Sequence, residues 1–299
     1  MNAGAGGAAT PFFLPARIGQ RYCLFHLPPA GMKPYAAVLH VHAFGEEMNR
    51  TRRMAALQAR ALAAAGVAVL QIDLLGCGDS SGDFADGRWE LWKEDLGLAH
   101  AWLTSQTGLP ASLWCVRLGA LLALDYARAA TAPLGPFVFW QPVTNGKAYL
   151  TQILRLRLAT ELLGGEASID AGANAGAADN LPAKAGSTQA MREHLRQGET
   201  LEIGGYAITP ELANAIDAVD AVQLAPSGNR VTWLEVVADT DRPMPPASQR
   251  VIDGWLRDGV AVDAACVAGK PFWTTQEITE CPTLLTATLA VLDREGVRS

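Results

Sequence analysis

The chain has 299 residues, of which 49% are hydrophobic and 18% charged, and its formal net charge at pH 7 is −6. This composition is typical of a globular protein with one large core or two modest ones, and the net negative charge argues against nucleic acid as a partner. No apolar run reaches the roughly 18 residues that a membrane span needs, so we expect no such span.

Residues 1–17 lack the basic start and the long apolar stretch of a signal peptide, and we expect a flexible tail there. The cysteines are widely spaced and form no Cys-x-x-Cys or Cys/His ligand pattern, so neither a metal site nor a disulfide framework is predicted. No organic cofactor is indicated either. Isolated, reduced cysteines favour a cytoplasmic location. They are Cys23, Cys77, Cys115, Cys266 and Cys281.

Strand and helix patterns alternate from residue 36 to residue 143, after a weakly alternating stretch at 21–27 that predicts antiparallel edge strands. Near-continuous apolar runs such as AAVLHVHAF predict strands buried on both faces. The alternation therefore predicts an α/β protein with a mostly parallel sheet flanked by helices. The predicted elements are strand 36–44, helix 52–66, strand 67–73, helix 88–106, a strand from residue 113, helix 119–130 and strand 136–143.

The alternation stops after residue 143 and resumes near residue 230, which predicts an insertion into the sheet domain. We expect a core of residues 18–143 and 227–299 and a lid insertion at 144–226, after the sixth strand. Segment 164–188 is rich in Gly, Ala, Asn and Ser, so we expect it to be mobile. The remaining predictions are helix 147–163, hairpin 200–209, helix 210–224, strand 230–238, helix 245–259, strand 260–267 and helix 282–296.

The stretch LWCVRLGALLAL at 113–124 combines the end of a strand, a tight turn and the start of a helix. In the nucleophile-elbow pattern G-x-S-x-G, Cys115 takes the place of the first glycine, Leu118 that of a spacer and Gly119 that of the last glycine. Arg117 fills the serine position. The motif therefore predicts the geometry of an elbow without its nucleophile.

Two further motifs precede the elbow. DLLGCGDSSGD at 73–83 places Asp73, Gly76, Gly78 and Ser80 directly after a strand, where glycines permit tight turns and polar side chains bond to the loop backbone. The other motif, HVHAFGEEMNRTRR at 40–53, follows the strand that begins at residue 36. It contains a short turn and two acids at the start of a helix, His42, Ala43, Phe44, Glu46 and Glu47.

These three features, taken in their order along the chain, resemble the α/β-hydrolase superfamily. The resemblance implies that backbone N–H groups around His42, Ala43, Phe44 and Leu118 lie where an oxyanion would be held. More closely, three segments at residues 49–84, 116–123 and 140–159, with GKPFWTTQEI at 269–278, resemble the exosortase A system-associated hydrolase 2 family. This resemblance runs from about residue 20 to residue 163. That resemblance implies a setting in exosortase-mediated protein sorting or exopolysaccharide production, with protein partners from those pathways.

The resemblance also gives positions for a catalytic triad. The acid position follows strand 230–238, where the sequence offers Asp239 and Asp241. The base would be a histidine within about 268–275, but that stretch contains AGKPFWTT, and no histidine follows His194. A hydroxyl nucleophile needs a base to remove its proton, and arginine stays protonated with a pKa above about 12. The ordinary serine-hydrolase mechanism is therefore not predicted.

Two roles remain open for Arg117 at this stage. It forms an internal ion pair with Asp239, Asp241, Glu46 or Glu47, or it holds the carboxylate or phosphate of a small anionic ligand at the helix N-terminus. We expect Phe272 and Trp273 to fill the space that the missing histidine vacates, and Cys115 to be a buried structural thiol.

Two functional hypotheses follow. The first is a non-catalytic or anion-binding protein on a hydrolase scaffold. The alternative is an active ester or thioester hydrolase with a non-standard site that uses His42, Glu46 or Glu47 as its base.

Overall fold

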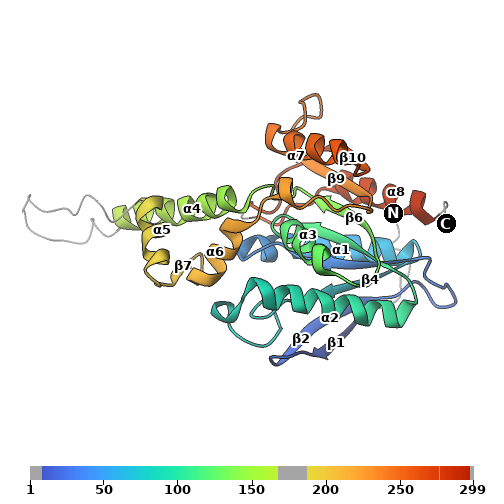
Figure 1. The fold of residues 1–299 in the computed structure, drawn as a ribbon. Coiled ribbons are helices and arrows are strands. Elements are labelled where there is room, and N and C mark those ends of the chain that lie inside the picture. Colours follow the sequence, from blue (N-terminus) through green and yellow to red (C-terminus); the bar gives the residue numbers. More distant parts are fainter. Residues whose placement is uncertain (1–8, 168–186, 276, 297–299) are drawn as a thin grey trace, which may run out of the picture.

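The computed structural model describes residues 9–167, 187–275 and 277–296, and it contains one eight-stranded sheet (Figure 1). The strand order is β1-β2-β4-β3-β5-β6-β9-β10. β1 and β2 are antiparallel to their neighbours, and all pairs from β4 to β10 are parallel. The strands are β1 (Thr10–Pro15), β2 (Gln20–His26), β3 (Ala36–Val41), β4 (Val67–Ile72), β5 (Ala111–Val116), β6 (Leu134–Trp140), β9 (Val231–Val237) and β10 (Val262–Ala268).

Helices cover both faces of this sheet and create two hydrophobic cores. Alternate residues of a strand enter opposite cores, as Val38 and Leu39 of β3 do, because successive side chains point to opposite faces. One face packs against α1 (Glu46–Ala64) and α8 (Pro282–Gly296). The other packs against α2 (Trp89–Thr107), α3 (Gly119–Ala129) and α7 (Pro246–Arg257), with the short helix η1 (Phe84–Asp86) nearby. The architecture is therefore the α/β-hydrolase fold that the motifs imply.

The N-terminal region differs from the tail expected over residues 1–17. Residues 10–15 form β1, which pairs antiparallel with β2 along its whole length. Phe12 of β1 stacks against Trp102, whose ring centroid lies 4.4 Å away, and this contact fixes the strand to the core. The alternation of buried and exposed side chains in the sequence PFFLP is too short to have predicted a strand. The expectation for residues 1–8 falls outside the described residues.

The insertion lies between β6 and β9, where the loss of alternation places it. It consists of α4 (Gly146–Ala167), α5 (Thr188–Arg196), the hairpin β7 (Leu201–Ile203) and β8 (Tyr206–Ile208), α6 (Pro210–Ala218) and η2 (Ala221–Gln223). Figure 1 shows α4 to α6 beside the sheet domain. α4 extends four residues beyond the predicted helix, and the predicted helix 210–224 is divided into α6 and η2. Most of segment 164–188 lies outside the described residues.

The two ends of the insertion are fastened to each other. Asn145 and Asp220 form an antiparallel bridge, and the Asn145 amide donates to Asp220 Oδ2 at 2.7 Å. Gly146 permits this approach, since a Cβ at that position would lie 1.8 Å from the Ile216 carbonyl oxygen. The lid therefore leaves and re-enters the sheet domain at one narrow junction.

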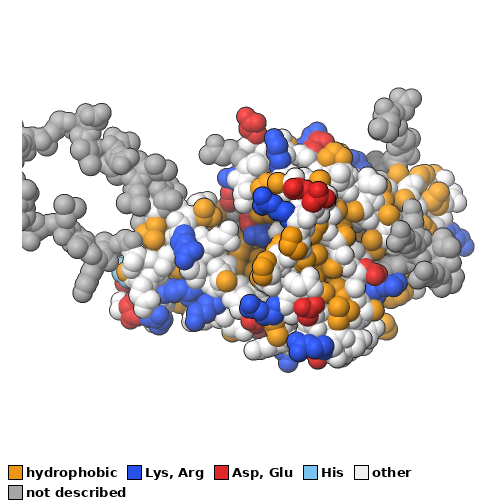
Figure 2. Space-filling view, turned by 90° about the horizontal axis from the view of Figure 1, so that it is seen from above, with side chains coloured by type: hydrophobic (Ala, Val, Ile, Leu, Met, Phe, Trp, Pro, Cys, Tyr) orange, Lys and Arg blue, Asp and Glu red, His pale blue; other side chains and the backbone are white. Residues whose placement is uncertain are grey.

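The surface shown in Figure 2 mixes acidic, basic and hydrophobic side chains. Among the described residues, no helix combines the length and the apolar character required to cross a bilayer.

Candidate functional site

The turn between β5 and α3 has the backbone of a nucleophile elbow. Arg117 has φ of +56°, a region that residues other than glycine seldom adopt. Gly119 is required at the next helical position, because a Cβ there would lie 2.5 Å from the His42 carbonyl oxygen. Cys115 takes the place of the first glycine and is fully buried in the sheet. The sequence therefore preserves the elbow while replacing its serine.

Arg117 forms an ion pair with Glu47 in the first turn of α1. Nε and Nη2 of the guanidinium both lie 3.0 Å from Glu47 Oε1, and Nη1 donates to the Gln141 carbonyl oxygen at 3.2 Å. The Arg117 side chain is 10% exposed and that of Glu47 is 17% exposed. Of the four carboxylates considered from the sequence, the structure thus pairs Arg117 with Glu47.

Two aromatic rings complete the surroundings of Arg117. The guanidinium carbon lies 5.8 Å from the ring centroid of Tyr149, on lid helix α4, and 5.3 Å from that of Trp273. The Tyr149 hydroxyl donates to Glu47 Oε2 at 2.8 Å, and burial raises the pKa of Tyr149 well above its usual value, with the Glu47 charge adding to this effect. The ion pair therefore joins the elbow, α1 and the lid.

Phe272 and Trp273 lie in the loop after β10, in the stretch where the resemblance predicts a base histidine. Both are buried and pack edge to face with centroids 5.1 Å apart. Arg50 of α1 anchors the end of this loop, since its Nη1 donates to the carbonyl oxygens of Thr274 and Thr275 at 2.7 and 2.8 Å. Trp273 thus presents a ring face to Arg117.

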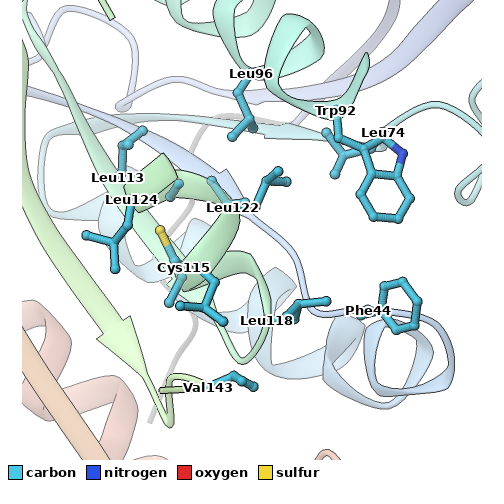
Figure 3. Packing of buried hydrophobic residues seen from close by; sticks show 14 of the residues in the cluster. Phe44, Leu74, Trp92, Leu96, Leu113, Cys115, Leu118, Leu122, Leu124 and Val143 are labelled. Carbon is cyan, nitrogen blue, oxygen red and sulfur yellow. The ribbon is translucent and has the colours of Figure 1, made fainter. Parts of the chain in front are cut away.

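The expected oxyanion loop is close to the elbow but leaves little free space. A cavity of about 20 Å³ lies between them, and this volume holds about one water molecule. Figure 3 shows Phe44, Leu118, Leu74 and Trp92 around this region, and the rings of Phe44 and Trp92 are 6.0 Å apart. The cavity is lined by His42, Ala43 and Phe44 of the expected oxyanion loop and by Leu118 and Gly119 of the elbow.

The other candidate acids are placed apart from this ion pair. Asp239 and Asp241 are exposed in the loop after β9, where Asp239 Oδ1 accepts from the Asp241 backbone N–H at 3.0 Å. Glu46 is exposed and its carboxylate contacts Asn49 and Arg50. Neither aspartate takes part in the hydrogen bonds that the structure gives Arg117. These positions therefore provide no acid for the elbow in this arrangement.

The sequence motifs do not single out a buried acid on β9. Glu235 of β9 is 1% exposed, and its Oε1 accepts from Trp233 Nε1 at 2.8 Å and from the Ser248 hydroxyl at 2.5 Å. Burial raises the pKa of Glu235, and the positive charge of Arg117 acts in the opposite direction. The available signal was a single acid within the otherwise apolar run VTWLEVV.

His42 lies in the expected oxyanion loop, and backbone groups contact both of its ring nitrogens. Nδ1 bonds to the Ala43 carbonyl oxygen at 2.7 Å, so it carries the proton, and Nε2 accepts from the Leu74 N–H at 3.4 Å. Burial lowers the pKa of His42. The ring is therefore neutral and acts as a bridge within the backbone of this region.

The thiols near the elbow are protonated at neutral pH. Cys77 and Cys115 are buried, and burial raises the pKa of both well above the usual value. Thiolate is the nucleophilic form, so neither residue is prepared for covalent chemistry. Within the described ranges, no group of three His, Cys, Asp or Glu side chains is placed to hold a metal ion.

The Asp73 loop supports α1 and the edge of the sheet. Asp73 Oδ2 accepts from the Asp79 N–H at 3.0 Å and contacts Arg52 Nη2 at 3.2 Å. The Ser80 hydroxyl donates to the Asp73 carbonyl oxygen at 2.5 Å. Gly76 and Gly78 have positive φ, and a Cβ on Gly78 would lie 2.0 Å from Asp73 Oδ2. Asp73, Gly76, Gly78 and Ser80 therefore all contribute to the shape of this loop.

Residues 32–251 match the model of the family described as serine aminopeptidase, S33. The chain belongs to this family. The matched range includes the elbow turn with Arg117 and the insertion before β9. No curated protein sequence matches the chain significantly.

Solved structures of several hydrolases share the fold of this chain at low sequence identity. The thermostable carboxyl esterase of Bacillus coagulans has a TM-score of 0.63 and 13% identity, covering 96% of this chain and 99% of its own. A soluble variant of the monoglyceride lipase of Saccharomyces cerevisiae has a TM-score of 0.62 and 13% identity, and the match covers 97% of this chain and 96% of the lipase. The proline iminopeptidase of Mycobacterium smegmatis has a TM-score of 0.56 and 13% identity, and the match covers 96% of this chain and 99% of the iminopeptidase. These likenesses establish the fold alone.

Proposed function

We propose that this chain is a non-catalytic member of the S33 family that binds an acidic group at Arg117. The observation that carries the proposal is the Arg117–Glu47 ion pair at the strained elbow position, where a hydroxyl nucleophile would stand. A serine-type hydrolase needs that hydroxyl and a base to remove its proton. A guanidinium stays protonated and supplies neither function.

The alternative, an ester or thioester hydrolase with a non-standard base, has less support. His42 is neutral but both ring nitrogens bond to the backbone. Glu47 is engaged by Arg117 and Tyr149, and Glu46 lies on the exposed side of α1. The cavity at the oxyanion loop holds about 20 Å³, which is too small for an acyl group. A hydrolase would have to rearrange all of these contacts before a substrate could react.

The ligand side of the proposal follows from the chemistry of the ion pair. Guanidinium binds carboxylates and phosphates through paired N–H groups, and Trp273 and Tyr149 give it two ring faces. The Glu47 side chain is 17% exposed, so its position is reached from the solvent side of α1. An acidic ligand or an acidic residue of a partner takes the place of the Glu47 carboxylate. The resemblance to the exosortase-associated family supports a partner from protein sorting or exopolysaccharide production.

Removal of Glu47 tests this proposal. In Glu47→Ala the guanidinium loses its internal carboxylate, and the space left by the side chain admits a small anion. We expect the melting temperature to fall and then to recover with added acetate or formate, compared with chloride at the same ionic strength. The wild type should respond less, because Glu47 already occupies the position.

The control is the double variant Glu47→Ala/Arg117→Met, which retains the space and lacks the cation. Recovery by acetate in the single variant but not in the double variant supports an anion position at Arg117. If both variants recover equally, or if neither recovers, Arg117 does not hold the anion and the proposal is wrong.

A further inference from the structure

A cavity of about 180 Å³ lies beneath α1, beside the ends of β2, β3 and β4. It is separate from the elbow: its lining comes from α1, from the strand ends and from the start of the Asp73 loop, and the elbow residues Arg117, Leu118 and Gly119 do not line it. Most of its wall is apolar. The apolar lining residues are Leu24, Met48, Ala55, Ala56 and Ile72.

The small residues of α1 create this space. Ala55 and Ala56 stand where larger side chains would fill the gap between the helix and β2. A dry cavity of about 150 Å³ in another protein accommodates benzene, so this one has room for a molecule of about that size. It is too small for the substrates that occupy ordinary ligand pockets of about 300–1,000 Å³.

His40 provides a polar group at the wall of the cavity. Its side chain is buried, and Nδ1 lies 3.2 Å from the Trp114 carbonyl oxygen. Burial lowers the pKa of His40 to about 3, so the ring is neutral and its single proton lies on Nδ1, facing the carbonyl. Nε2 is then an acceptor, and the contacts of the described residues include no donor for it. Because His40 lines the cavity, a ligand donor placed there would give this acceptor a hydrogen-bond partner.

The charges at the wall of the cavity balance each other. Arg52 and Asp73 form an ion pair at 3.2 Å, and His42 is neutral because its burial lowers its pKa. Gln71 accepts the proton of His26 Nε2 at Oε1, at 2.9 Å, which leaves its amide N–H groups as donors. Besides the hydroxyl residues Tyr22 and Thr51, the lining offers the His40 acceptor and the Gln71 amide donor, and it offers no unpaired charge. A charged ligand would therefore lose solvation without gaining a counter-ion.

We infer that this cavity binds a small neutral molecule with an apolar body about the size of a benzene ring and one hydroxyl or N–H group that donates to His40 Nε2. A hydroxyl fits best, since it donates to His40 while it accepts from the amide of Gln71. The site is independent of Arg117, so it is not a consequence of the function proposed above.

Phenol is the probe. Toluene, which lacks the hydrogen-bond donor, and benzoate, which carries a negative charge, are the matched compounds. We expect ligand-observed NMR to show phenol binding, with toluene and benzoate each at least about tenfold weaker. The ¹⁵N resonance of His40 Nε2 should move from its free-acceptor position as phenol donates to it. Ala56→Leu fills the cavity and should abolish both signals, whereas Ala64→Leu, on the exposed side of the same helix, should leave them unchanged.

The outcomes are distinct. Phenol binding that survives in Ala56→Leu, or that leaves the His40 Nε2 resonance unmoved, overturns the site, as does the absence of phenol binding to the wild type. Equal binding of toluene and phenol overturns the role of His40. The Glu47→Ala variant should bind phenol as the wild type does, so failure of the anion proposal leaves this test unaffected.

Discussion

At the scale of single residues, the elbow turn holds its shape independently of the side chain it presents. The Arg117 N–H donates to the Trp140 carbonyl oxygen at 3.1 Å, and its own carbonyl oxygen accepts from Ala120 and Val143 at 3.1 and 3.2 Å. These three backbone bonds offset the cost of the positive φ. A change between serine and arginine therefore alters the chemistry of the turn without dismantling it.

Arg117→Ser should lower stability and leave the fold in place. The change removes the partner of Glu47, whose side chain is only 17% exposed, so a nearly buried carboxylate remains unpaired. We expect the free energy of unfolding to fall by about 3–5 kcal/mol, measured by urea denaturation. Arg230→Ser, which removes a half-exposed arginine paired with Asp263, is the control and should cost at most about 1 kcal/mol. Equal losses would show that the Arg117 pair is not buried in solution.

Neither the wild type nor Arg117→Ser should react with a fluorophosphonate probe. The wild type has no hydroxyl at the elbow, and the introduced serine would face Trp273 and Glu47 rather than a histidine. Mass spectrometry of the intact protein after incubation with the probe is the measurement. Stoichiometric labelling of the wild type would refute the non-catalytic assignment, and labelling of the variant alone would reveal a base that we have missed.

At the scale of elements, α1 connects the separate parts of the site. Its first turn supplies Glu47 to the elbow, Arg50 holds the loop after β10, and Arg52 binds the Asp73 loop. Arg53 pairs with Glu280, before α8. One helix therefore sets the positions of the lid contact, the aromatic loop and the cavity wall, and its displacement would alter all three.

The buried face of α1 also contains polar groups without protein partners. Within the described residues, neither the amide oxygen nor the amide nitrogen of Gln58 has a hydrogen-bond partner, and the side chain is completely buried. Gln58→Met keeps the length of the side chain and removes the unsatisfied groups, so we expect the free energy of unfolding to rise by about 1–2 kcal/mol. Gln152→Met, at an exposed position of α4, is the control for the change in helix propensity. A loss of stability in Gln58→Met would indicate that internal water satisfies the amide.

At the scale of the whole molecule, buried histidines make stability depend on pH. Burial lowers the pKa of four histidines, and for His40 it lowers it to about 3. The folded state keeps these rings neutral, whereas the unfolded chain binds protons below its ordinary pKa of about 6.5. Stability is therefore fully present above that pH and is lost as the pH falls. The four are His26, His40, His42 and His100.

Urea denaturation at several pH values measures this loss. Below pH 6.5 each buried neutral histidine should contribute up to about 1.4 kcal/mol per pH unit to the decline in the free energy of unfolding. Between pH 6 and 5, His26→Gln should make the free energy of unfolding depend less steeply on pH, by about 1.4 kcal/mol per pH unit, which corresponds to one proton. Between pH 7 and 8 the two proteins should show the same slope, because histidine protonation no longer changes. An unchanged slope below pH 6.5 would mean that His26 titrates normally in the folded protein.

The sequence by itself determined the architecture, the order of the elements, the arginine at the elbow position 117 and the absence of any histidine after His194. Strand and helix periods act over a few neighbouring residues, and a substitution at a motif position needs no coordinates to be seen. The exceptions are local: the short strand β1 carries too little pattern, and α1 begins at Glu46 rather than near residue 52 because the polar residues before its apolar stripe hide its first turns.

Only the tertiary structure decided what Arg117 touches. The sequence left four carboxylates open, since Glu46, Glu47, Asp239 and Asp241 all lie in loops or helix starts that converge on the carboxyl ends of the strands. Glu47 forms the pair because the first turn of α1 directs it towards the elbow, while both aspartates remain exposed. Tyr149 arrives from the lid, and the cavity beneath α1 arises from alanines packed against distant strands. Such contacts join residues far apart in the chain, 102 positions for Glu47 and Tyr149 and 225 for Arg50 and Thr275, and no local period encodes them.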